Sequence, residues 1–447
     1  MDLDLIERFA APVPRYTSYP TAPHFSADIG PEQYADWLER LPSGAALSIY
    51  AHVPFCDTLC WYCGCTTKAT RRAAPVKSYV ESLLAEIALV ARHVPRSRAA
   101  AHVHWGGGSP SILTPADIGR LAAAIHGTFH LAAGAEFAVE VDPRGLDEER
   151  VRAFAAAGVN RASFGVQDFA PAVQKAINRE QSFEETARVI ELFRARGVEG
   201  INIDLVYGLP HQSCATLEET LEQVIALAPD RIALFGYAHL PSRLPHQRMI
   251  DDAALPGPRE RYAQASLAAE RLQAAGYRRV GLDHFARPQD ALASRPVHRN
   301  FQGYTTDSAD ALIGLGASAI GRLPQGYVQN ASVTADYQRR ITDGRLATAR
   351  GRVLTEEDKA RGLVIESLMC ELTFPAGELL AQFPAQAERL LAEARALVMR
   401  DADGLVSADD GEAGFHVTEK GRPFVRSLCA AFDTYLGQGA ARHASGI

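Results

Sequence analysis

The chain has 447 residues, of which 47% are hydrophobic and 22% are charged, and its formal net charge is −7 at pH 7. These values are typical of an ordinary soluble globular protein with one large domain or two to three smaller ones. The acidic balance lacks the basic footprint of a nucleic-acid-binding protein, and no apolar stretch approaches the roughly 20 residues that span a bilayer, so we expect neither nucleic acid nor membrane as a partner.

The first 40 residues form a predicted arm rich in proline and tyrosine, and the acidic, amphipathic N-terminus does not have the pattern of a signal peptide. Four of the seven cysteines lie between positions 56 and 65, whereas a disulfide framework would spread them along the chain. We therefore expect a reducing compartment and a cytoplasmic protein. The scattered Cys214, Cys370 and Cys429 are interpreted as small buried hydrophobic residues.

A cysteine loop follows a predicted strand over 47–53. Cys56, Cys60 and Cys63 stand in C-x3-C-x2-C spacing, with Cys65 directly after them. Three thiolates on so short a segment can hold three irons of a cubane cluster and leave the fourth iron without a protein ligand. A zinc ribbon would offer two separated C-x2-C pairs or a nearby pair of histidines, and a thioredoxin-like motif would lack the first cysteine. The spacing resembles the signature of the radical S-adenosylmethionine (radical SAM) enzymes.

From the cysteine loop onward, short β-rich runs alternate with amphipathic helices. Capping patterns predict helix starts at Ser78, Ser182 and Thr216, and the pair Thr114-Pro115 predicts another. Six such βα units without hairpin signals between them predict a parallel sheet covered by helices. The predicted strands are 47–53, 102–105, 137–141, 161–166, 201–206 and 232–237.

The alternation fits two α/β architectures, an open doubly wound sheet or an incomplete (β/α) barrel, and both place function at the carboxyl ends of the strands. Beyond about residue 335 the alternation stops and helices dominate. The segment 415–421 predicts a short strand and turn before a last helix, a winged-helix-like shape for which we expect a structural or lid role. We expect three parts: an arm over 1–40, a catalytic domain over 41–335 and a mainly helical domain over 336–447.

The predicted strands end in residues that could reach a cofactor. The second ends in Gly106-Gly107-Gly108-Ser109, where the missing Cβ atoms let backbone amides approach a ligand. The third ends at Glu140 and the fourth at Gln167. The fifth ends at Asp204, and Arg179 follows the fourth. A helix cap or a surface group explains any single one of these residues equally well, but the whole set predicts a ligand site.

Longer motifs cover essentially the whole chain, at 14–21, 105–110, 164–169, 178–181, 202–210, 281–288, 300–306 and 432–436. Together with the cysteine loop, they resemble the oxygen-independent coproporphyrinogen III oxidases. Haem-chaperone-like relatives share the barrel motifs but generally lack the long arm and a cysteine at the place of Cys65, and this chain has both. Ser109 departs from the family's usual threonine and keeps the hydroxyl.

The resemblance implies an incomplete (β/α)6 parallel barrel of the radical SAM type, with an N-terminal arm and a mainly helical C-terminal domain. It also implies two cofactors, one [4Fe-4S] cluster on Cys56, Cys60 and Cys63 and S-adenosylmethionine on the open iron. The reduced cluster would cleave S-adenosylmethionine, and the resulting 5′-deoxyadenosyl radical would remove a hydrogen from a propionate side chain. Loss of CO2 and one electron would then leave a vinyl group.

Two such events would convert coproporphyrinogen III to protoporphyrinogen IX in anaerobic haem biosynthesis. The electron would come from a low-potential donor such as flavodoxin or ferredoxin, and we expect a monomer. The N-terminal arm and the C-terminal helices could serve as lids that exclude water and oxygen.

The resemblance further implies the residues of the site. The implied catalytic set is Tyr50, His52, Cys65 and Arg179. Because Tyr50 and His52 are two residues apart, they project to one side of their strand. The implied contacts to S-adenosylmethionine are Tyr50, Tyr62, Gly107, Gly108, Ser109, Glu140, Gln167, Arg179, Asp204, Ala238 and Ile320.

Chemistry supports the charged members of this set. A carboxylate suits the amino group or ribose hydroxyls of S-adenosylmethionine, and Arg179 suits its carboxylate. His52 is either structural or supports the cluster from behind. Cys65 would close the cluster as a fourth ligand, so we expect it to line the substrate side without touching iron.

Because the substrate carries four propionates, arginines should face its cavity, and Arg15, Arg287 and Arg299 lie in the motifs expected to border it. Two alternatives remain open. One is a haem chaperone on the same barrel, which uses both cofactors and does not decarboxylate. The other is a structural domain in which the cysteines hold zinc and the winged-helix-like unit meets nucleic acid.

Overall fold

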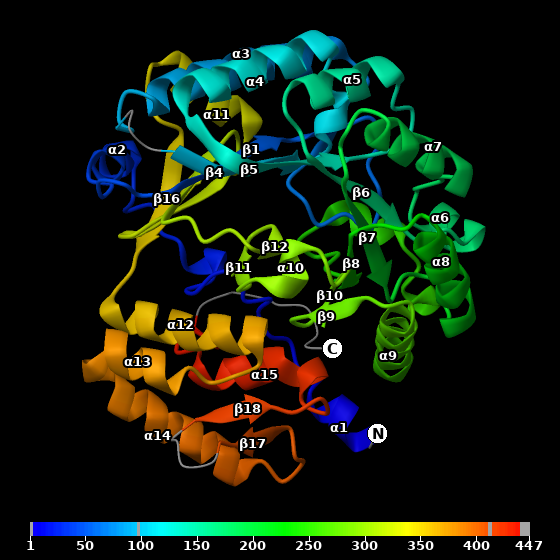
Figure 1. Cartoon of the computed structure of the whole chain (residues 1–447), viewed down its shortest axis with the longest axis vertical. Helices are drawn as coiled ribbons and strands as arrows, with labels where there is room; N and C mark the ends of the chain where they lie inside the picture. Colours follow the sequence, from blue (N-terminus) through cyan, green and yellow to red (C-terminus); the bar gives the residue numbers. More distant parts are fainter. Residues whose placement is uncertain (1–2, 96–98, 410–413, 439–447) are drawn as a thin grey trace.

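The computed structural model describes residues 3–95, 99–409 and 414–438. A large sheet with helices on its outer side forms one part of the molecule, and a smaller helical unit lies below it (Figure 1). Helix α1 (Leu3–Arg8) lies beside the smaller unit and shares its apolar core. None of the helices in these ranges is long and apolar enough to cross a membrane.

The six predicted parallel strands are present and pair in the order in which they occur along the chain. A doubly wound sheet would reverse its order at a switch point, whereas this sequential order is that of a (β/α) barrel. The last strand of the six does not pair with the first, so the barrel is incomplete. The strands are β1 (Leu47–Val53), β4 (Ala99–Gly107), β5 (His130–Val141), β6 (Arg161–Gln167), β7 (Gly200–Tyr207) and β8 (Arg231–Gly236).

Helices cover the outer face of this sheet because each connection between parallel strands has to cross over it. Their apolar sides join the apolar residues of the strands in one core, in which the side chains of Trp105, Phe154 and Phe164 are fully buried. The helices are α3 (Ala73–Val90), α4 (Pro115–Thr128), α5 (Glu148–Ala156), α6 (Pro171–Ala176), α7 (Phe183–Arg194), α8 (Cys214–Ala226) and α9 (Pro258–Ala274).

Two of the four predicted helix starts are confirmed. Thr114 caps α4 by accepting from the Asp117 amide, and Ser182 caps α7 in the same way. The prediction at Ser78 is wrong, because α3 begins five residues earlier and Ser78 lies inside it. The prediction at Thr216 is wrong by three residues, because the cap of α8 is Ser213, with Thr216 as the reciprocal partner of a capping box.

Further strands, one parallel and the others antiparallel, extend both edges of the six-stranded parallel sheet. Next to β1 lie β13 (Ala311–Leu315), which is parallel to it, and then β14 (Ile320–Leu323), β15 (Gly326–Asn330) and β16 (Thr348–Val353). Next to β8 lie β10 (His284–Ala286) and β9 (Arg278–Val280). Two small two-stranded sheets and two helices complete this region: β2 (Phe55–Cys56) parallel to β3 (Lys68–Ala69), β11 (His298–Asn300) antiparallel to β12 (Gly303–Thr305), α10 (Ala291–Ser294) and α11 (Thr334–Thr342).

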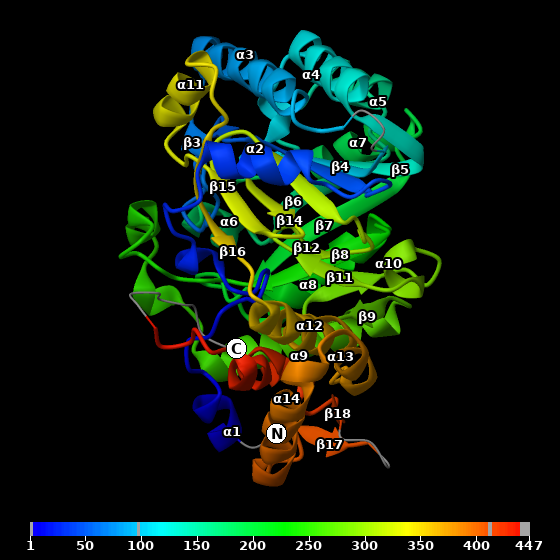
Figure 2. The ribbon, with the colours of Figure 1, turned by 90° about the vertical axis from the view of Figure 1, so that its left-hand side faces the viewer.

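The arm runs from one unit to the other. Ser26 forms a β-bridge with Gly351 at the end of the sheet, and α2 (Pro31–Glu39) packs over the antiparallel edge (Figure 2). Earlier in the arm, Tyr16 and Tyr19 are buried in the apolar core of the smaller unit. The arm therefore ties the two units together.

The smaller unit contains α12 (Glu356–Glu371), α13 (Ala376–Gln382), α14 (Pro384–Arg400) and α15 (Val425–Cys429), and α1 (Leu3–Arg8) packs against it. Its two-stranded sheet of β17 (Val406–Ala408) and β18 (Phe415–Val417) matches the strand and turn predicted over 415–421. The large sheet continues past residue 335, since its strand β16 ends at Val353. The exact division of the chain into domains stays a prediction.

Candidate active site

A cavity of about 770 Å³ lies on the inner face of the sheet, between the cysteine loop and the strands β4 to β8. Its volume is in the range of small-molecule and cofactor sites. Thirteen of the sixteen residues predicted for the site line it: Cys56, Cys60, Tyr62, Cys63, Cys65, Gly107, Gly108, Ser109, Glu140, Gln167, Arg179, Asp204 and Ala238.

Hydrogen bonds from distant segments fix the cysteine loop. The Asn178 side chain donates to the Leu59 carbonyl at 2.9 Å, and the Trp61 amide donates to the Ile177 carbonyl at 2.9 Å. His246 donates through Nε2 to the Cys63 carbonyl at 2.7 Å. These contacts hold the backbone on both sides of Cys60, so the spacing of the thiols is set by the barrel as well as by the loop.

The environments of the cysteine thiols differ. Cys60 Sγ accepts from Arg179 Nη1 at 3.5 Å and from Arg144 Nη2 at 3.6 Å, two cations suited to a thiolate. The hydrogen bond from Cys65 lowers the pKa of Cys63 to about 6. Burial raises the pKa of Cys56 to about 12 in the metal-free state. Iron would deprotonate this thiol, because a bound metal ion favours the thiolate.

The three cysteines fit a cubane cluster. All are free thiols, and they face one cavity. In the described part of the chain, no group of three or more His, Cys, Asp or Glu side chains is arranged to hold a single metal ion. A cluster binds each cysteine through a different iron, so its three sulfurs do not have to converge on one point.

Asp142 and Arg144 form a charged group with Arg179 that the sequence analysis missed. Arg144 donates to Asp142 at 2.7 Å and Arg179 donates to it at 3.3 Å. Burial alone would raise the pKa of Asp142, but the two guanidinium groups lower it to about 2. The position of these residues directly after a predicted strand end was the available signal. The Asp142 carboxylate therefore holds the two guanidinium groups beside Cys60.

The triple glycine is required by close packing. Gly107 has φ +114°, and a Cβ on it would lie 2.5 Å from the ring of His52. A Cβ on Gly106 would lie 2.5 Å from Glu140 Oε1. The Gly107 amide donates to Glu140 at 3.0 Å, and the amides of Gly108 and Ser109 donate to carbonyls of the preceding chain. The amide donors that we expected to meet a ligand are therefore used within the protein.

Glu140 and Asp204 both face the cavity, but their pKa values are shifted in opposite directions. Glu140 accepts from His104 Nε2 at 3.1 Å, a partner that the sequence analysis did not identify. Burial would raise the pKa of Glu140, but His104 outweighs it and the pKa is lowered. Asp204 accepts from Ser163 and Asn202, each at 2.9 Å. Burial and then the neighbouring Glu140 raise its pKa to about 6.

Among the described residues, Tyr50, His52 and Ile320 do not line the cavity. His52 Nε2 donates to the Thr66 carbonyl at 3.0 Å, which leaves Nδ1 to accept from the Tyr50 hydroxyl at 3.0 Å. Burial lowers the pKa of His52, so the ring is neutral. The pair lies behind the cysteine loop, and Ile320 is the first residue of β14.

Gln247 is another residue that the sequence analysis missed. Its side-chain amide donates to the Tyr62 carbonyl and to the Ala238 carbonyl, both at 3.1 Å. Tyr62 and Ala238 were both predicted to contact S-adenosylmethionine. Gln247 therefore holds the cysteine loop at a fixed place relative to the end of β8.

The three predicted substrate arginines separate in space. Arg15 and Arg299 line the cavity. Arg287 lies elsewhere, where its Nε donates to the Pro229 carbonyl at 3.0 Å and its guanidinium stacks on Tyr277. Cys65 is exposed and lines the cavity, and its hydrogen bond to Cys63 raises its pKa.

Comparison with known proteins gives consistent results. Residues 50–224 match the model of the radical SAM superfamily. The chain is 48% identical to an oxygen-independent coproporphyrinogen III oxidase of Bradyrhizobium diazoefficiens over 97% of both chains. It is 45% identical to the enzyme of the same name from Paracoccus denitrificans, over 100% of this chain and 99% of the relative.

A solved structure has the same fold over nearly its whole length. It is a coproporphyrinogen III oxidase of Escherichia coli, described as a radical SAM enzyme, with a TM-score of 0.90 and 39% sequence identity. The match covers 97% of this chain and 99% of that chain.

Proposed function

The chain belongs to the oxygen-independent coproporphyrinogen III oxidases of the radical SAM superfamily, and on this premise we propose which of its residues carry the reaction. The reaction is the oxidative decarboxylation of two propionates of coproporphyrinogen III to vinyl groups, which gives protoporphyrinogen IX for haem biosynthesis. Its cofactors are one [4Fe-4S] cluster and S-adenosylmethionine. Membership in this family overturns the zinc-domain alternative, and the full-length relatives are oxidases, which argues against the haem chaperone.

Cys56, Cys60 and Cys63 would hold the cluster. When bound, the cluster and S-adenosylmethionine supply the one-electron chemistry that removes an unactivated hydrogen. The cations Arg144 and Arg179 stabilise the thiolate of Cys60 in advance, since both already point at its sulfur.

Residues that line the cavity would hold S-adenosylmethionine. Arg179 suits its carboxylate, and Glu140, kept ionised by His104, suits its amino group. Asp204 suits the ribose hydroxyls. The remaining proposed contacts are Tyr50, Tyr62, Gly107, Gly108, Ser109, Gln167, Ala238 and Ile320, of which Tyr50 and Ile320 lie outside the cavity lining among the described residues.

Tyr50 and His52 act as positioning residues in this proposal. The neutral His52 ring joins β1 to the Thr66 carbonyl and therefore fixes the segment that carries Cys65. Cys65 faces the cavity from the end of this segment, and we propose that it lines the substrate side.

One observation carries the assignment of the site. The cysteine loop, the charged strand ends and two arginines line the same cavity, so a cluster, its cofactor and an anionic substrate can meet there. The electron donor, the monomeric state and the cytoplasmic location are proposals that no contact of the chain addresses: a low-potential protein such as flavodoxin or ferredoxin would dock near the exposed side of the cysteine loop.

The test is an anaerobic assay of reconstituted protein with coproporphyrinogen III, S-adenosylmethionine and a low-potential reductant. We expect 5′-deoxyadenosine together with a tetrapyrrole that has lost two CO2 units, both identified by mass. Formation of 5′-deoxyadenosine with an intact tetrapyrrole would contradict the substrate assignment and favour the haem-chaperone alternative.

A further inference from the structure

A second, smaller pocket opens from the main cavity. Its volume is about 90 Å³, against about 770 Å³ for the main cavity. Arg15, Gly236, Tyr237 and Arg299 line both, so the two are continuous. The pocket has room for a short acidic side chain and is far too small for a tetrapyrrole ring.

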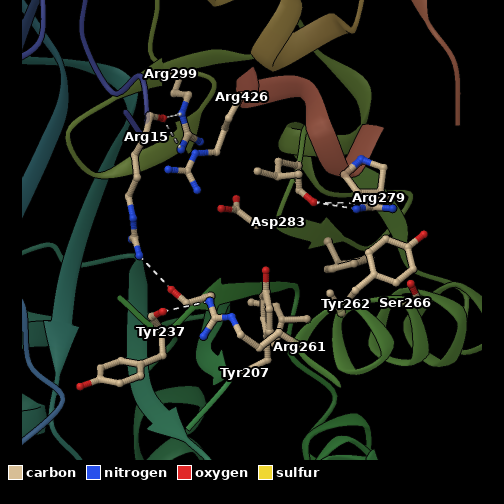
Figure 3. Close-up of a pocket in the computed structure, with 16 residues that line it drawn as sticks. Arg15, Tyr207, Tyr237, Arg261, Tyr262, Ser266, Arg279, Asp283, Arg299 and Arg426 are labelled. Carbon is tan, nitrogen blue, oxygen red and sulfur yellow. Dashed lines mark hydrogen bonds between the residues drawn. The ribbon is translucent and has the colours of Figure 1, made fainter. Parts of the chain in front are cut away.

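Five arginines and one carboxylate line this pocket, which we call the arginine pocket. The arginines come from five separate segments, and Figure 3 shows their guanidinium groups around the opening, with Asp283 between them. They are Arg15 of the arm, Arg261 of α9, Arg279 of β9, Arg299 of β11 and Arg426 of α15. The lining therefore carries a large excess of positive charge.

The donors of these arginines reach backbone oxygens. Arg15 donates to the Gly236 carbonyl at 2.8 Å, and Arg279 donates to the Leu282 carbonyl at 2.9 Å. Arg299 donates to the Arg15 carbonyl through Nε and Nη2, while its Nη1 is buried without a partner. Within the described residues, none of these three takes part in a salt bridge. A guanidinium has five N–H groups, so each of the three keeps donors for a ligand.

The charges in the pocket repel one another. Burial and then the charge of Arg15 lower the pKa of Arg426 to about 10. Burial would raise the pKa of Asp283, but His284 and then Arg299 and Arg15 lower it to about 2, so this carboxylate is ionised and offsets one cation. An anion that enters the pocket would relieve the remaining repulsion.

We propose that the arginine pocket binds a propionate of the tetrapyrrole that does not react. The proposal rests on the proposed function, in which two of the four propionates are decarboxylated and two are kept. The reacting propionates have to approach the cofactors, and the pocket lining contains no residue of the cysteine loop and none of the residues proposed for S-adenosylmethionine. A carboxylate held there anchors the ring, while Arg15 and Arg299 face the main cavity at the entrance.

The test is porphyrin binding by the reconstituted enzyme, measured by anaerobic equilibrium dialysis. The probes are coproporphyrin III, with four propionates, protoporphyrin IX, which keeps the two unreacted ones, and the tetramethyl ester of coproporphyrin III. The variants are Arg279→Gln and, in case it does not fold, Arg279→Lys, which keeps the charge and loses the forked geometry. Arg287→Gln is the matched control, because Arg287 lies outside both cavities.

We expect Arg279→Gln to weaken the binding of coproporphyrin III and of protoporphyrin IX equally, by roughly tenfold, since one charge-assisted hydrogen bond is lost. Porphyrin binding by Arg287→Gln should equal that of the wild type. Binding of the tetramethyl ester, which has no carboxylate charge, should be the same in Arg279→Gln and in the wild type. A weakening of coproporphyrin III alone would overturn the proposal, because the pocket would then hold a reacting propionate. Unchanged binding in both Arg279 variants, or an equal loss in Arg287→Gln, would also overturn it.

The assay of 5′-deoxyadenosine and CO2 on the wild-type enzyme separates this inference from the proposed function. If porphyrin binding depends on Arg279 but no decarboxylation occurs, the proposal for the arginine pocket stands and the proposed function is wrong. If decarboxylation occurs but porphyrin binding does not depend on Arg279, the proposed function stands and the proposal for the arginine pocket is wrong.

Discussion

The main cavity and the arginine pocket share Arg15 and Arg299, yet their charges are arranged in different ways. Around the cysteine loop, charged side chains pair with one another, as Asp142 does with Arg144 and Arg179. In the arginine pocket, the cations donate to backbone carbonyls and one carboxylate stands among five guanidinium groups.

This difference separates two tasks. A site whose charges are already paired and fixed suits cofactors that have to be held in one geometry. A site with excess charge of one sign is completed by a ligand of the opposite sign. We therefore propose that the barrel supplies the chemistry, and that the contact between the arm, the sheet edge and the helical unit supplies recognition.

The largest expected effect tests the chemical half of this comparison. Cys56→Ser removes a proposed cluster ligand, and we expect 5′-deoxyadenosine formation to fall at least about 10³-fold, or ~4 kcal/mol of barrier. Iron and sulfide analysis should show loss of the cluster. Cys214→Ser, at the first residue of α8, should behave as wild type. Retention of a full cluster in Cys56→Ser would remove this cysteine from the ligand set.

The packing of the glycine turn against His52 gives the next largest effect. Gly107→Ala places a Cβ 2.5 Å from the His52 ring at a φ of +114°, and we expect the free energy of unfolding to fall by about 3 kcal/mol. The control is Gly119→Ala in α4, where a Cβ meets nothing within 4 Å and should stabilise by about 0.5–1 kcal/mol. Urea unfolding measures both. Equal stability of the two variants would mean that the turn is not held tightly.

A difference in the pH dependence of stability between two aspartate variants would sharpen the comparison. The pKa of Asp204, about 6, lies above its value in the unfolded chain, so the wild type loses stability as pH rises from about 4 to 6. This loss amounts to up to ~3 kcal/mol, and we expect it to be absent in Asp204→Asn. The pKa of Asp283, about 2, lies below its unfolded value, so its stabilisation is complete above about pH 4.

Asp283→Asn should therefore be less stable by about 2 kcal/mol at every pH between 4 and 7. Urea unfolding of both variants at pH 4, 5, 6 and 7 tests this pair. The two electrostatic assignments would be reversed if the stability difference between Asp283→Asn and wild type varied from pH 4 to 7 while the difference between Asp204→Asn and wild type stayed constant.

The smallest expected effect concerns the bridge between the cysteine loop and β8. Gln247→Ala removes the hydrogen bonds to the Tyr62 and Ala238 carbonyls, and we expect the KM for S-adenosylmethionine to rise about threefold to tenfold. Porphyrin binding at the arginine pocket should not change. The control is Gln338→Ala, because the Gln338 amide donates to Ser78 and Ser82, both on the outer helix α3. An unchanged KM would show that the loop keeps its place without Gln247.

Much of the main cavity could be predicted from the sequence because its residues lie at fixed positions relative to local patterns. The spacing of the cysteines and the ends of the parallel strands placed Cys60, Glu140 and Asp204 in one site, since all these strands end on the same side of the sheet. The six parallel strands followed from the same alternation. The further strands at both edges were missed because they are short and carry no repeated spacing.

The arginine pocket could be predicted only in part. Arg15 stood in a recognisable motif and Arg299 directly before one, whereas Arg261, Arg279 and Arg426 stand alone in the sequence and meet only through tertiary packing. The same limit explains Arg287, which lies in a motif and points away from both sites. Convergence of separate segments through tertiary packing leaves no local pattern in the sequence.

The position of the arm has a consequence for synthesis of the chain. Arg426 donates to the Pro14 carbonyl at 3.0 Å, and Tyr19 hydrogen-bonds Thr434, so these two contacts of the arm form only after residue 434 has been made. The strands from β1 to β8 are complete by residue 236. On a ribosome, which releases the chain from its N-terminus, the barrel and its cysteine loop can fold while the arm still lacks its contacts with Arg426 and Thr434. A nascent chain could therefore acquire its iron–sulfur cluster well before it could grip a porphyrin precursor.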